Sequence, residues 1–324
     1  MGLPHVCDAQ GTEMITQLDI RFSLDLYAGV RPIKTWFGLT TPLADPRAAH
    51  IDMVLVRENT DGLFYARGRG VIDGEGESAA AYDTMSISCK GTARVVDFAM
   101  RLTEQRQARG RSGPLTNVNK ANAFRSMAFW REVFVERAAR FPQITKEHTY
   151  VDAMALNLVL KPWTYDVLVT ENMFGDILSD LIASLVGRMG MALSGDIGDD
   201  HGLFQPAHGT APDIAGRGIS NPTAMILSAA MMLEWLGEHH ADAALLDGAS
   251  LIEGAVRKAF LEQVVRPYDF GGRSSPGRSP PLALATLQRI SCRPSKAWVC
   301  SESACAILTP PRPTRWHSGS VWSR

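Results

Sequence analysis

The sequence predicts an α/β protein. Two short apolar runs rich in β-branched residues, 51–56 (IDMVLV) and 165–170 (YDVLVT), have the length and composition of buried strands. The second leads into a longer stretch with helical spacing. The chain has 324 residues, of which 45% are hydrophobic and 21% charged. That composition supplies enough apolar residues for one large α/β unit or for two domains.

The most informative stretch is 170–187, TENMFGDILSDLIASLVG. Its apolar residues recur at helical spacing and predict a helix of roughly three turns, with Gly175 breaking the chain before it and Gly187 at its end. Asp176 and Asp180 are four residues apart, so both carboxylates project from one helix face. Such a pair suits a divalent cation such as Mg²⁺ or Mn²⁺. The alternative is that both aspartates only stabilise a helix N-terminus.

Apolar periodicity and chain-breaking residues predict the other elements in the same way. The stretch 68–77 is rich in glycine and is expected to be a loop, and Asn221 and Gly237 are expected to flank a buried helix. A further strand is predicted at 115–118. Helices are predicted over 18–26, 93–107, 123–140, 149–160, 222–236 and 245–265.

Several charged residues stand where such a fold places ligands. Arg21 and Arg31 could converge from a helix and a strand on one anion, because guanidinium groups match carboxylates bidentately. Arg57 directly follows a buried strand, a common ligand position in α/β proteins. Lys120 lies at a strand-to-helix junction and could serve as a general base near a metal. For each single residue, a solvated surface position is the alternative.

Composition excludes some classes of function. The net charge of −1 gives no reason to expect nucleic acid or an anionic membrane as partner, and no apolar run has the length of a membrane span. Five cysteines at irregular spacing, without a CxxC pair, favour the cytoplasm over a disulfide framework. The tail 274–324 differs from the rest: it has seven Lys or Arg residues, one acid and no sustained periodicity. It is expected to be disordered.

Six motifs, in this order, resemble the isocitrate/isopropylmalate dehydrogenase family: RFSLDLYAGVRP, VRENTDG, NKAN, YVDAMALNLV, ENMFGDILSDL and HGTAPDIAG followed by NP. The resemblance covers about Arg21 to Gly272. It implies a two-domain fold with a mixed central sheet flanked by helices. The large, cofactor-side domain would contain 1–26 and 188–272, the small domain 27–187, and 273–324 would be a tail foreign to the family. Family members begin with a strand and a GDGIGPE-like turn, so the chain is expected to be truncated at its N-terminus.

The resemblance also implies roles for individual residues. Substrate carboxylates would be bound by Arg21, Arg31 and Arg57; Mg²⁺ or Mn²⁺ would be bound by Asp152, Asp176 and Asp180. Lys120 would assist proton transfer. In the family's homodimer this lysine and the first aspartate reach the partner's site, so each active site would need two chains. The loop around the cofactor adenosine would include His208, Gly209, Thr210, Asp213, Ile214 and Asn221. Asp213 favours NAD, because a carboxylate accepts hydrogen bonds from ribose hydroxyls and repels a 2′-phosphate.

The implied activity is NAD-dependent oxidative decarboxylation of a 2-hydroxy diacid. The first choice of substrate is 3-isopropylmalate, as in leucine biosynthesis, followed by tartrate or D-malate and isocitrate. The family tyrosine after the third arginine falls on Phe64, with Tyr65 one residue later as the candidate proton donor. In an extended segment that offset would point the two rings to opposite faces. A hypothesis of another class is an inactive remnant that only dimerises or binds.

Overall fold

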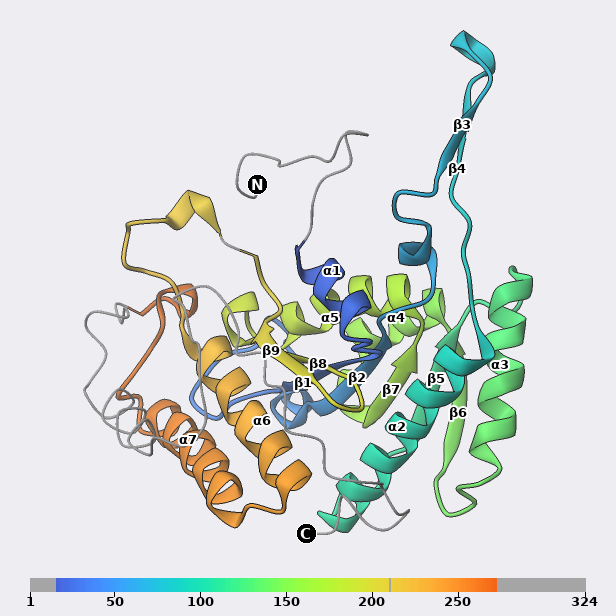
Figure 1. Ribbon diagram of the computed structural model, residues 1–324. Coiled ribbons are helices and arrows are strands. Elements are labelled where there is room, and N and C mark those ends of the chain that lie inside the picture. The colour runs from blue at the N-terminus through green and yellow to red at the C-terminus, as the bar shows by residue number, and fades with distance from the viewer. Residues whose placement is uncertain (1–15, 210, 273–324) are drawn as a thin grey trace. The chain divides into compact units, whose positions relative to one another are not determined.

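The computed structural model describes residues 16–209 and 211–272 (Figure 1). The predictions for Thr210 and for the tail from residue 273 lie outside the described residues. The described chain forms two compact units. Residues 16–30 and 54–179 make up one unit, here called the Arg57 unit; residues 31–53 and 180–272 make up the other, the Arg31 unit. The chain passes between them within β1 (Ala28–Lys34), β2 (Asp52–Glu58) and α5 (Asn172–Leu185).

This division differs from the domain ranges predicted from the sequence. Helix α1 (Thr16–Ser23) belongs to the Arg57 unit, where Asp19 pairs with Arg67 at 2.7 Å. Residues 31–53 belong to the Arg31 unit, where Arg31 pairs with Asp196 at 3.0 Å. Backbone contacts between residues distant in the sequence define this division, and sequence spacing does not reveal such contacts.

In the Arg57 unit, four strands of the main sheet follow the order β6-β5-β7-β2, and the β6–β5, β5–β7 and β7–β2 pairings are all parallel. Helix α2 packs against α3 and β7, and α4 packs against β5 and β6. Ser88 caps α2 by accepting a hydrogen bond from the Gly91 N–H at 2.9 Å. The bounds not yet given are β5 Leu115–Asn119, β6 Lys146–Tyr150, β7 Val167–Thr170, α2 Cys89–Ala108, α3 Arg125–Ala138 and α4 Val151–Leu160.

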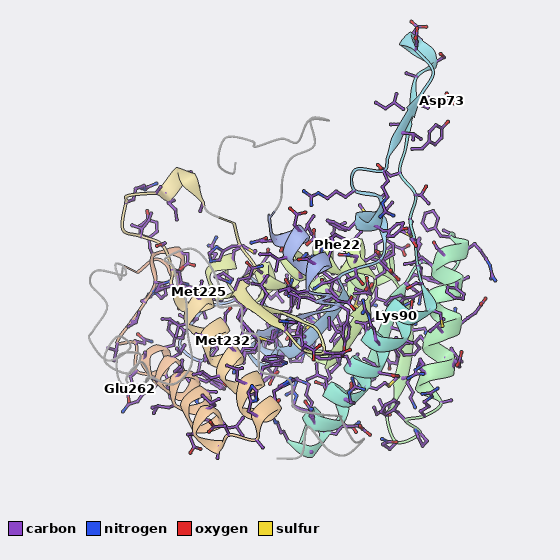
Figure 2. The ribbon with its side chains drawn as sticks, viewed as in Figure 1. Phe22, Asp73, Lys90, Met225, Met232 and Glu262 are labelled. Carbon is purple, nitrogen blue, oxygen red and sulfur yellow. The ribbon has the colours of Figure 1, made fainter. Side chains whose placement is uncertain are left out.

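A two-stranded arm extends away from the body of the Arg57 unit (Figure 1), with Asp73 on it labelled in Figure 2. Its strands β3 (Val71–Asp73) and β4 (Ala80–Tyr82) pair antiparallel. Ile72 and Tyr82 on this arm are 78% and 57% exposed. The prediction of a loop over 68–77 is therefore wrong for Val71–Asp73, because these residues form a strand that pairs with Ala80–Tyr82, outside the predicted range.

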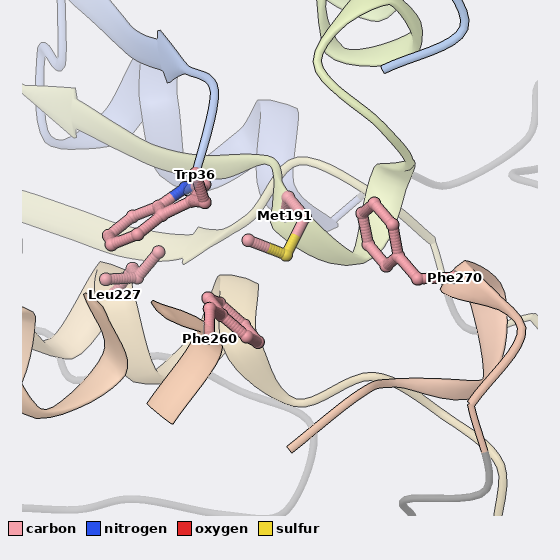
Figure 3. Packing of buried hydrophobic residues seen from close by; sticks show 5 residues of the cluster. All are labelled: Trp36, Met191, Leu227, Phe260 and Phe270. Atoms are coloured by element: carbon pink, nitrogen blue, oxygen red, sulfur yellow. The ribbon is translucent and has the colours of Figure 1, made fainter. Parts of the chain in front are cut away.

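The Arg31 unit contains an antiparallel hairpin, β8 (Leu193–Ile197) with β9 (Gly202–Pro206). Helix α6 (Thr223–His240) packs against both strands and against α7 (Ala243–Leu261). One of the unit's hydrophobic clusters is shown in Figure 3 and consists of Trp36, Met191, Leu227, Phe260 and Phe270. Parallel and antiparallel pairings thus both occur, and the predicted α/β fold with a mixed sheet flanked by helices is confirmed.

Two glycines were expected to bound helices but lie inside them. α5 begins at Asn172, three residues before Gly175, because the Glu171 carboxylate accepts hydrogen bonds from the next N–H groups, including Phe174 at 2.7 Å. α6 continues past Gly237 to His240. Both glycines permit a close approach: a Cβ would lie 2.7 Å from Arg57 Cγ at the first and 2.8 Å from Leu246 Cδ2 at the second.

Candidate active site

The candidate site lies at the carboxyl ends of the parallel strands of the Arg57 unit. Thr149, Val118, Thr170 and Arg57 occupy one register row across β6, β5, β7 and β2. The carboxyl ends of parallel strands face the same edge of a sheet, which is where α/β proteins bind ligands. Residues just beyond this row therefore gather at one edge, and three candidates from the sequence, Lys120, Asp152 and Asp176, follow it in the chain.

Arg57 is held in place by α5. Its side chain is buried, with the residue 2% exposed. The Nε–H group donates to Asn172 Oδ1 at 2.8 Å, and Nη1 forms a close ion pair with Asp176. Asn172 in turn donates to the Asp61 carbonyl at 3.0 Å. A buried guanidinium with a fixed orientation is suited to bind a carboxylate. Asn172 was not predicted from the sequence, although it lies within the ENMFGDILSDL motif, two residues after the end of β7.

Lys120 and Asp152 form a second charged pair in the same unit. Lys120 follows β5 and Asp152 lies in the first turn of α4; Nζ and Oδ1 are 2.8 Å apart. The hydrogen bond from Lys120 lowers the pKa of Asp152. The lysine side chain is 24% exposed and the aspartate side chain 68% exposed. The pair thus presents a carboxylate to solvent while it holds the ammonium group at the strand end.

Phe64, and not Tyr65, lies against Arg57. The Arg57 guanidinium carbon is 5.2 Å from the centre of the Phe64 ring, whereas Arg69 lies over the Tyr65 ring at 4.3 Å. The segment Leu63–Ala66 is a 3₁₀-helix and not the extended strand assumed from the sequence. In such a helix consecutive side chains point about 120° apart. The two rings therefore point in different directions because the segment is helical.

Arg21 is buried on α1 within the Arg57 unit, with 6% of its surface exposed. Arg31 lies in the other unit and is buried as well, at 5%. Its guanidinium donates to an Asp196 carboxylate oxygen at 3.0 Å and to the Gly195 carbonyl at 3.3 Å. Both arginines are thus buried and are not solvated surface residues.

Asp176 and Asp180 are both exposed and lie four residues apart on one continuous helix, α5. Exposed carboxylates at this spacing are oxygen donors of the type that Mg²⁺ and Mn²⁺ prefer. Among the described residues, no group of three or more His, Cys, Asp or Glu side chains could hold a metal ion. Within one chain, Asp152 therefore does not complete a three-carboxylate site with the two aspartates of α5.

The predicted cofactor residues lie in the Arg31 unit. His208 Nδ1 is 2.9 Å from the Gly209 carbonyl, and Asp213 is exposed in a 3₁₀ turn that ends at Ile214. Asn221 accepts a hydrogen bond from the Thr223 N–H at 3.1 Å, at the start of α6. Asp213 thus presents an exposed carboxylate, a group that can accept hydrogen bonds from ribose hydroxyls.

Two buried carboxyl groups near Arg57 escaped the sequence analysis. Burial, reinforced by the charge of Asp61, raises the pKa of Glu58 to about 7. Burial also raises the pKa of Glu171, whose carboxylate accepts the first N–H groups of α5. Glu58 is the last residue of β2 and Glu171 directly follows β7, and both stand in motifs quoted from the sequence, which were the signals for them.

Fold and site together define an α/β protein that gathers guanidinium, ammonium and carboxylate groups at the carboxyl ends of neighbouring parallel strands. A family profile described as isocitrate/isopropylmalate dehydrogenase matches residues 5–280. The chain therefore belongs to the isocitrate/isopropylmalate dehydrogenase family, and the resemblance seen in its motifs is confirmed.

Individual relatives agree with this assignment. The 3-isopropylmalate/3-methylmalate dehydrogenase of Methanocaldococcus jannaschii is 40% identical over 254 residues, which cover 78% of this chain and 71% of the relative. The 3-isopropylmalate dehydrogenase of Aquifex aeolicus is 42% identical over 220 residues, covering 67% of this chain but only 59% of the relative. The crystal structure of isocitrate dehydrogenase from Methylococcus capsulatus superposes with a TM-score of 0.74 at 36% identity, covering 88% of this chain and 79% of that one. Within the described part of this chain, none of the helices has the length and apolar character needed to cross a membrane.

Proposed function

We propose that the chain catalyses NAD-dependent oxidative decarboxylation of a 2-hydroxy diacid, with Mg²⁺ or Mn²⁺ as metal and 3-isopropylmalate as substrate. The observation that carries the proposal is the pair of charged contacts at one strand edge: Arg57 with Asp176, and Lys120 with Asp152. They supply a carboxylate-binding group, a proton-accepting group and acidic metal ligands at or just beyond the carboxyl ends of neighbouring parallel strands. The irregular cysteine spacing favours the cytoplasm as its location.

The residues of the site would divide the work as follows. Arg57, oriented by Asn172, would bind a substrate carboxylate, and Arg21 and Arg31 remain predicted carboxylate ligands. Asp176 and Asp180 would hold the divalent ion, together with Asp152 of a second chain. The ion and NAD, when bound, supply electrophilic polarisation and a hydride acceptor. Lys120 of the second chain would take the proton of the substrate hydroxyl.

Exposed apolar side chains support a homodimer. On α4, Leu156 and Leu160 are 59% and 61% exposed, and on α5, Ile177 is 58% exposed. Leu156 and Leu160 are four residues apart, so they form an apolar stripe on one face of α4. Apolar stripes of this kind on soluble proteins mark contacts with other chains. A partner packed on these helices would bring its Lys120–Asp152 pair to the strand edge of the first chain.

The activity is tested by NADH formation at 340 nm with Mn²⁺ and a panel of 3-isopropylmalate, D-malate, tartrate and isocitrate. Turnover is expected to be fastest with 3-isopropylmalate and slower with NADP than with NAD. Arg57→Lys is expected to reduce kcat/KM by about 100-fold, because a lysine cannot form the bidentate contact. Arg125→Gln, a change at a side chain that is 81% exposed on α3, serves as the matched control and should have no effect. No turnover with any substrate, alongside retained dimerisation, would support the inactive remnant instead.

The shared site has its own test. Lys120→Gln and Asp176→Asn chains are mixed, unfolded and refolded together. If Lys120 serves the site of its partner, every mixed dimer keeps one intact site, and statistical assembly restores about 25% of wild-type activity. If each chain uses only its own residues, no intact site forms and the mixture stays inactive. Leu156→Asp should yield monomers in light scattering, whereas Leu251→Asp, at an equally exposed position on α7, should not.

A further inference from the structure

Arg31 forms a buried ion pair that the proposed reaction does not explain. It lies on β1 and Asp196 lies on β8, and these two strands are neighbours in the main sheet. Nη2 of the arginine is 3.0 Å from Oδ1 of the aspartate, and Nη1 donates to the Gly195 carbonyl at 3.3 Å. The two charged side chains are 6% and 0% exposed, and both belong to the Arg31 unit. One of the three arginines predicted to bind substrate is therefore paired with a carboxylate inside its own unit.

This pair differs from the pair that Arg57 forms with Asp176. The Asp176 side chain is 53% exposed, so a divalent ion from solvent could compete with the guanidinium for it. The Asp196 side chain has no exposed surface through which a cation could reach it. A buried carboxylate is also costly unless a cation stays beside it. Asp196 therefore stays with Arg31 in the folded protein, whether or not a metal ion is bound elsewhere.

The Asp196 carboxylate acts on any anion that Arg31 binds. A guanidinium has more N–H donors than one carboxylate uses, so it can contact a second carboxylate while the first stays in place. Two carboxylates on one guanidinium lie within about 4–6 Å of each other and repel. The attraction of Arg31 for a substrate carboxylate is therefore largely offset by Asp196. Arg31 would orient the substrate through hydrogen bonds and add little net charge to its binding site.

We propose that Asp196 is a specificity-determining residue that favours substrates with two carboxylates over substrates with three. This inference rests on the proposed function, in which Arg21, Arg31 and Arg57 bind the substrate. When one of the three guanidinium charges is neutralised, the remaining two match the charge of a 2-hydroxy diacid such as 3-isopropylmalate. A third carboxylate, as in isocitrate, is left without a counter-charge among the arginines. An uncompensated charge of this kind discriminates against the competing ligand.

The experiment measures dissociation constants by calorimetric titration of the full chain, in the presence of Mn²⁺ and without NAD, so that no turnover is required. Asp196→Asn keeps an oxygen that accepts from Arg31 but removes the negative charge. The variant is expected to bind 3-isopropylmalate at least about fivefold more tightly than the wild type, because the repulsion is lost. Its affinity for isocitrate should rise by a larger factor, because the third carboxylate gains a counter-charge.

The stability of the same variant is expected to change in the opposite direction. The urea midpoint of Asp196→Asn should fall, because the buried Arg31 loses a charged partner. A purely structural role of Asp196 predicts this loss of stability without any gain in affinity. Affinity and stability together therefore distinguish a specificity role from a structural one.

A double variant and a matched control complete the test. Arg31→Gln/Asp196→Asn removes both buried charges and so avoids an unpaired charge if the single variant fails to fold. Its affinity for 3-isopropylmalate should fall by less than about tenfold, the effect of a neutral hydrogen bond, whereas loss of a fully charged contact would weaken binding by about 100-fold. Glu253→Gln removes a carboxylate that pairs with Lys34 on the same strand, and it should bind both acids like the wild type.

The outcomes separate this inference from the proposed function. Turnover of 3-isopropylmalate by the wild type, with unchanged affinities in Asp196→Asn, would overturn the inference and leave the proposed function intact. Equal gains for both acids would overturn the assignment of specificity. Tighter binding by the variant, without turnover by the wild type, would support the inference and contradict the proposed function. Binding of neither acid by the wild type would contradict both.

Discussion

Glu58 offers a quantitative prediction about stability and pH. Its side chain is completely buried directly after Arg57, and burial together with the charge of Asp61 raises its pKa from 4.5 to about 7. Between about pH 4.5 and 7 the unfolded chain has lost this proton while the folded chain retains it. Stability contributed by this group is therefore fully present below pH 4.5 and is lost as the pH rises to about 7. Each tenfold change in a proton affinity corresponds to about 1.4 kcal/mol, so the loss amounts to about 3 kcal/mol.

The variant Glu58→Gln isolates this effect because glutamine fits the same contacts. Oε2 of the glutamate accepts the N–H groups of Thr60 and Asp61 at 2.8 and 2.5 Å, and an amide oxygen can accept both. Oε1 lies 2.6 Å from the Thr60 hydroxyl, which can turn to accept a hydrogen bond from the new NH₂ group. The glutamine carries no charge to bury. The variant should therefore match the wild type near pH 5 and exceed its stability by about 3 kcal/mol at pH 8.

The assay is urea denaturation of both proteins at intervals from pH 5 to pH 8, followed by circular dichroism. Titration of all other groups cancels in the difference between the two free energies of unfolding. Glu132→Gln, at a side chain 57% exposed on α3, measures the effect of removing one negative charge from the surface. A difference between wild type and Glu58→Gln that stays constant across the range would refute the reasoning. It would mean that the three hydrogen bonds outweigh burial and keep the carboxylate ionised.

Three further predictions concern single contacts in the Arg57 unit. Trp130→Phe removes a fully buried indole whose N–H donates to Asn117 Oδ1 at 2.8 Å. The free energy of unfolding measured in urea titrations should fall by about 2–4 kcal/mol. A loss below about 1 kcal/mol would contradict this packing of the indole. Gly62→Ala should lower the free energy of unfolding by at least about 2 kcal/mol in the same assay, because φ is +81° and the new Cβ would lie 2.6 Å from Glu171 Oε2. An unchanged urea midpoint would show that Gly62 does not adopt this backbone conformation. Phe64→Tyr places a phenol beside Arg57 and should raise the rate of decarboxylation, measured by CO₂ release, by up to about 100-fold. An unchanged rate would show that another group protonates the product of decarboxylation.

Nearly all residues of β2, β5 and β7 are buried, so both faces of these strands are covered, and their apolar runs revealed them. The strand expected to carry Arg31 is present as β1. β6 reads KEHTY and is an edge strand with no fully buried residue, so no apolar pattern exposes it. The β8–β9 hairpin was hidden by Gly195 and Gly202, which mimic turn residues. A Cβ at these two positions would lie within about 3 Å of Phe204, so the glycines make room for that ring.

For the site, sequence spacing identified residues but not their contacts. The i, i+4 spacing of Asp176 and Asp180 survives in α5, because it depends only on helix periodicity. The pairing of Asp176 with Arg57 requires β2 and the turn after it to pack closely against the start of α5. The small residues Gly62 and Gly175 permit this close packing. The roles of such glycines are decided by long-range packing. Local pattern therefore suggested a chain break at Gly175 where the fold needs a small residue.

The two charged pairs have a consequence for assembly. In one chain Asp176 pairs with Arg57 and Asp152 pairs with Lys120. Each carboxylate is therefore neutralised by a cation that the proposed reaction would use to bind substrate or to accept a proton. A divalent ion at Asp176 and Asp180 would compete with Arg57 for the carboxylate and free the guanidinium for substrate. The exposed Asp152 would provide a third carboxylate from a second chain and leave its own Lys120 beside the same substrate. On this argument, metal binding, substrate binding and dimerisation are linked through exchange of ion-pair partners, and metal affinity should fall when Leu156→Asp separates the chains.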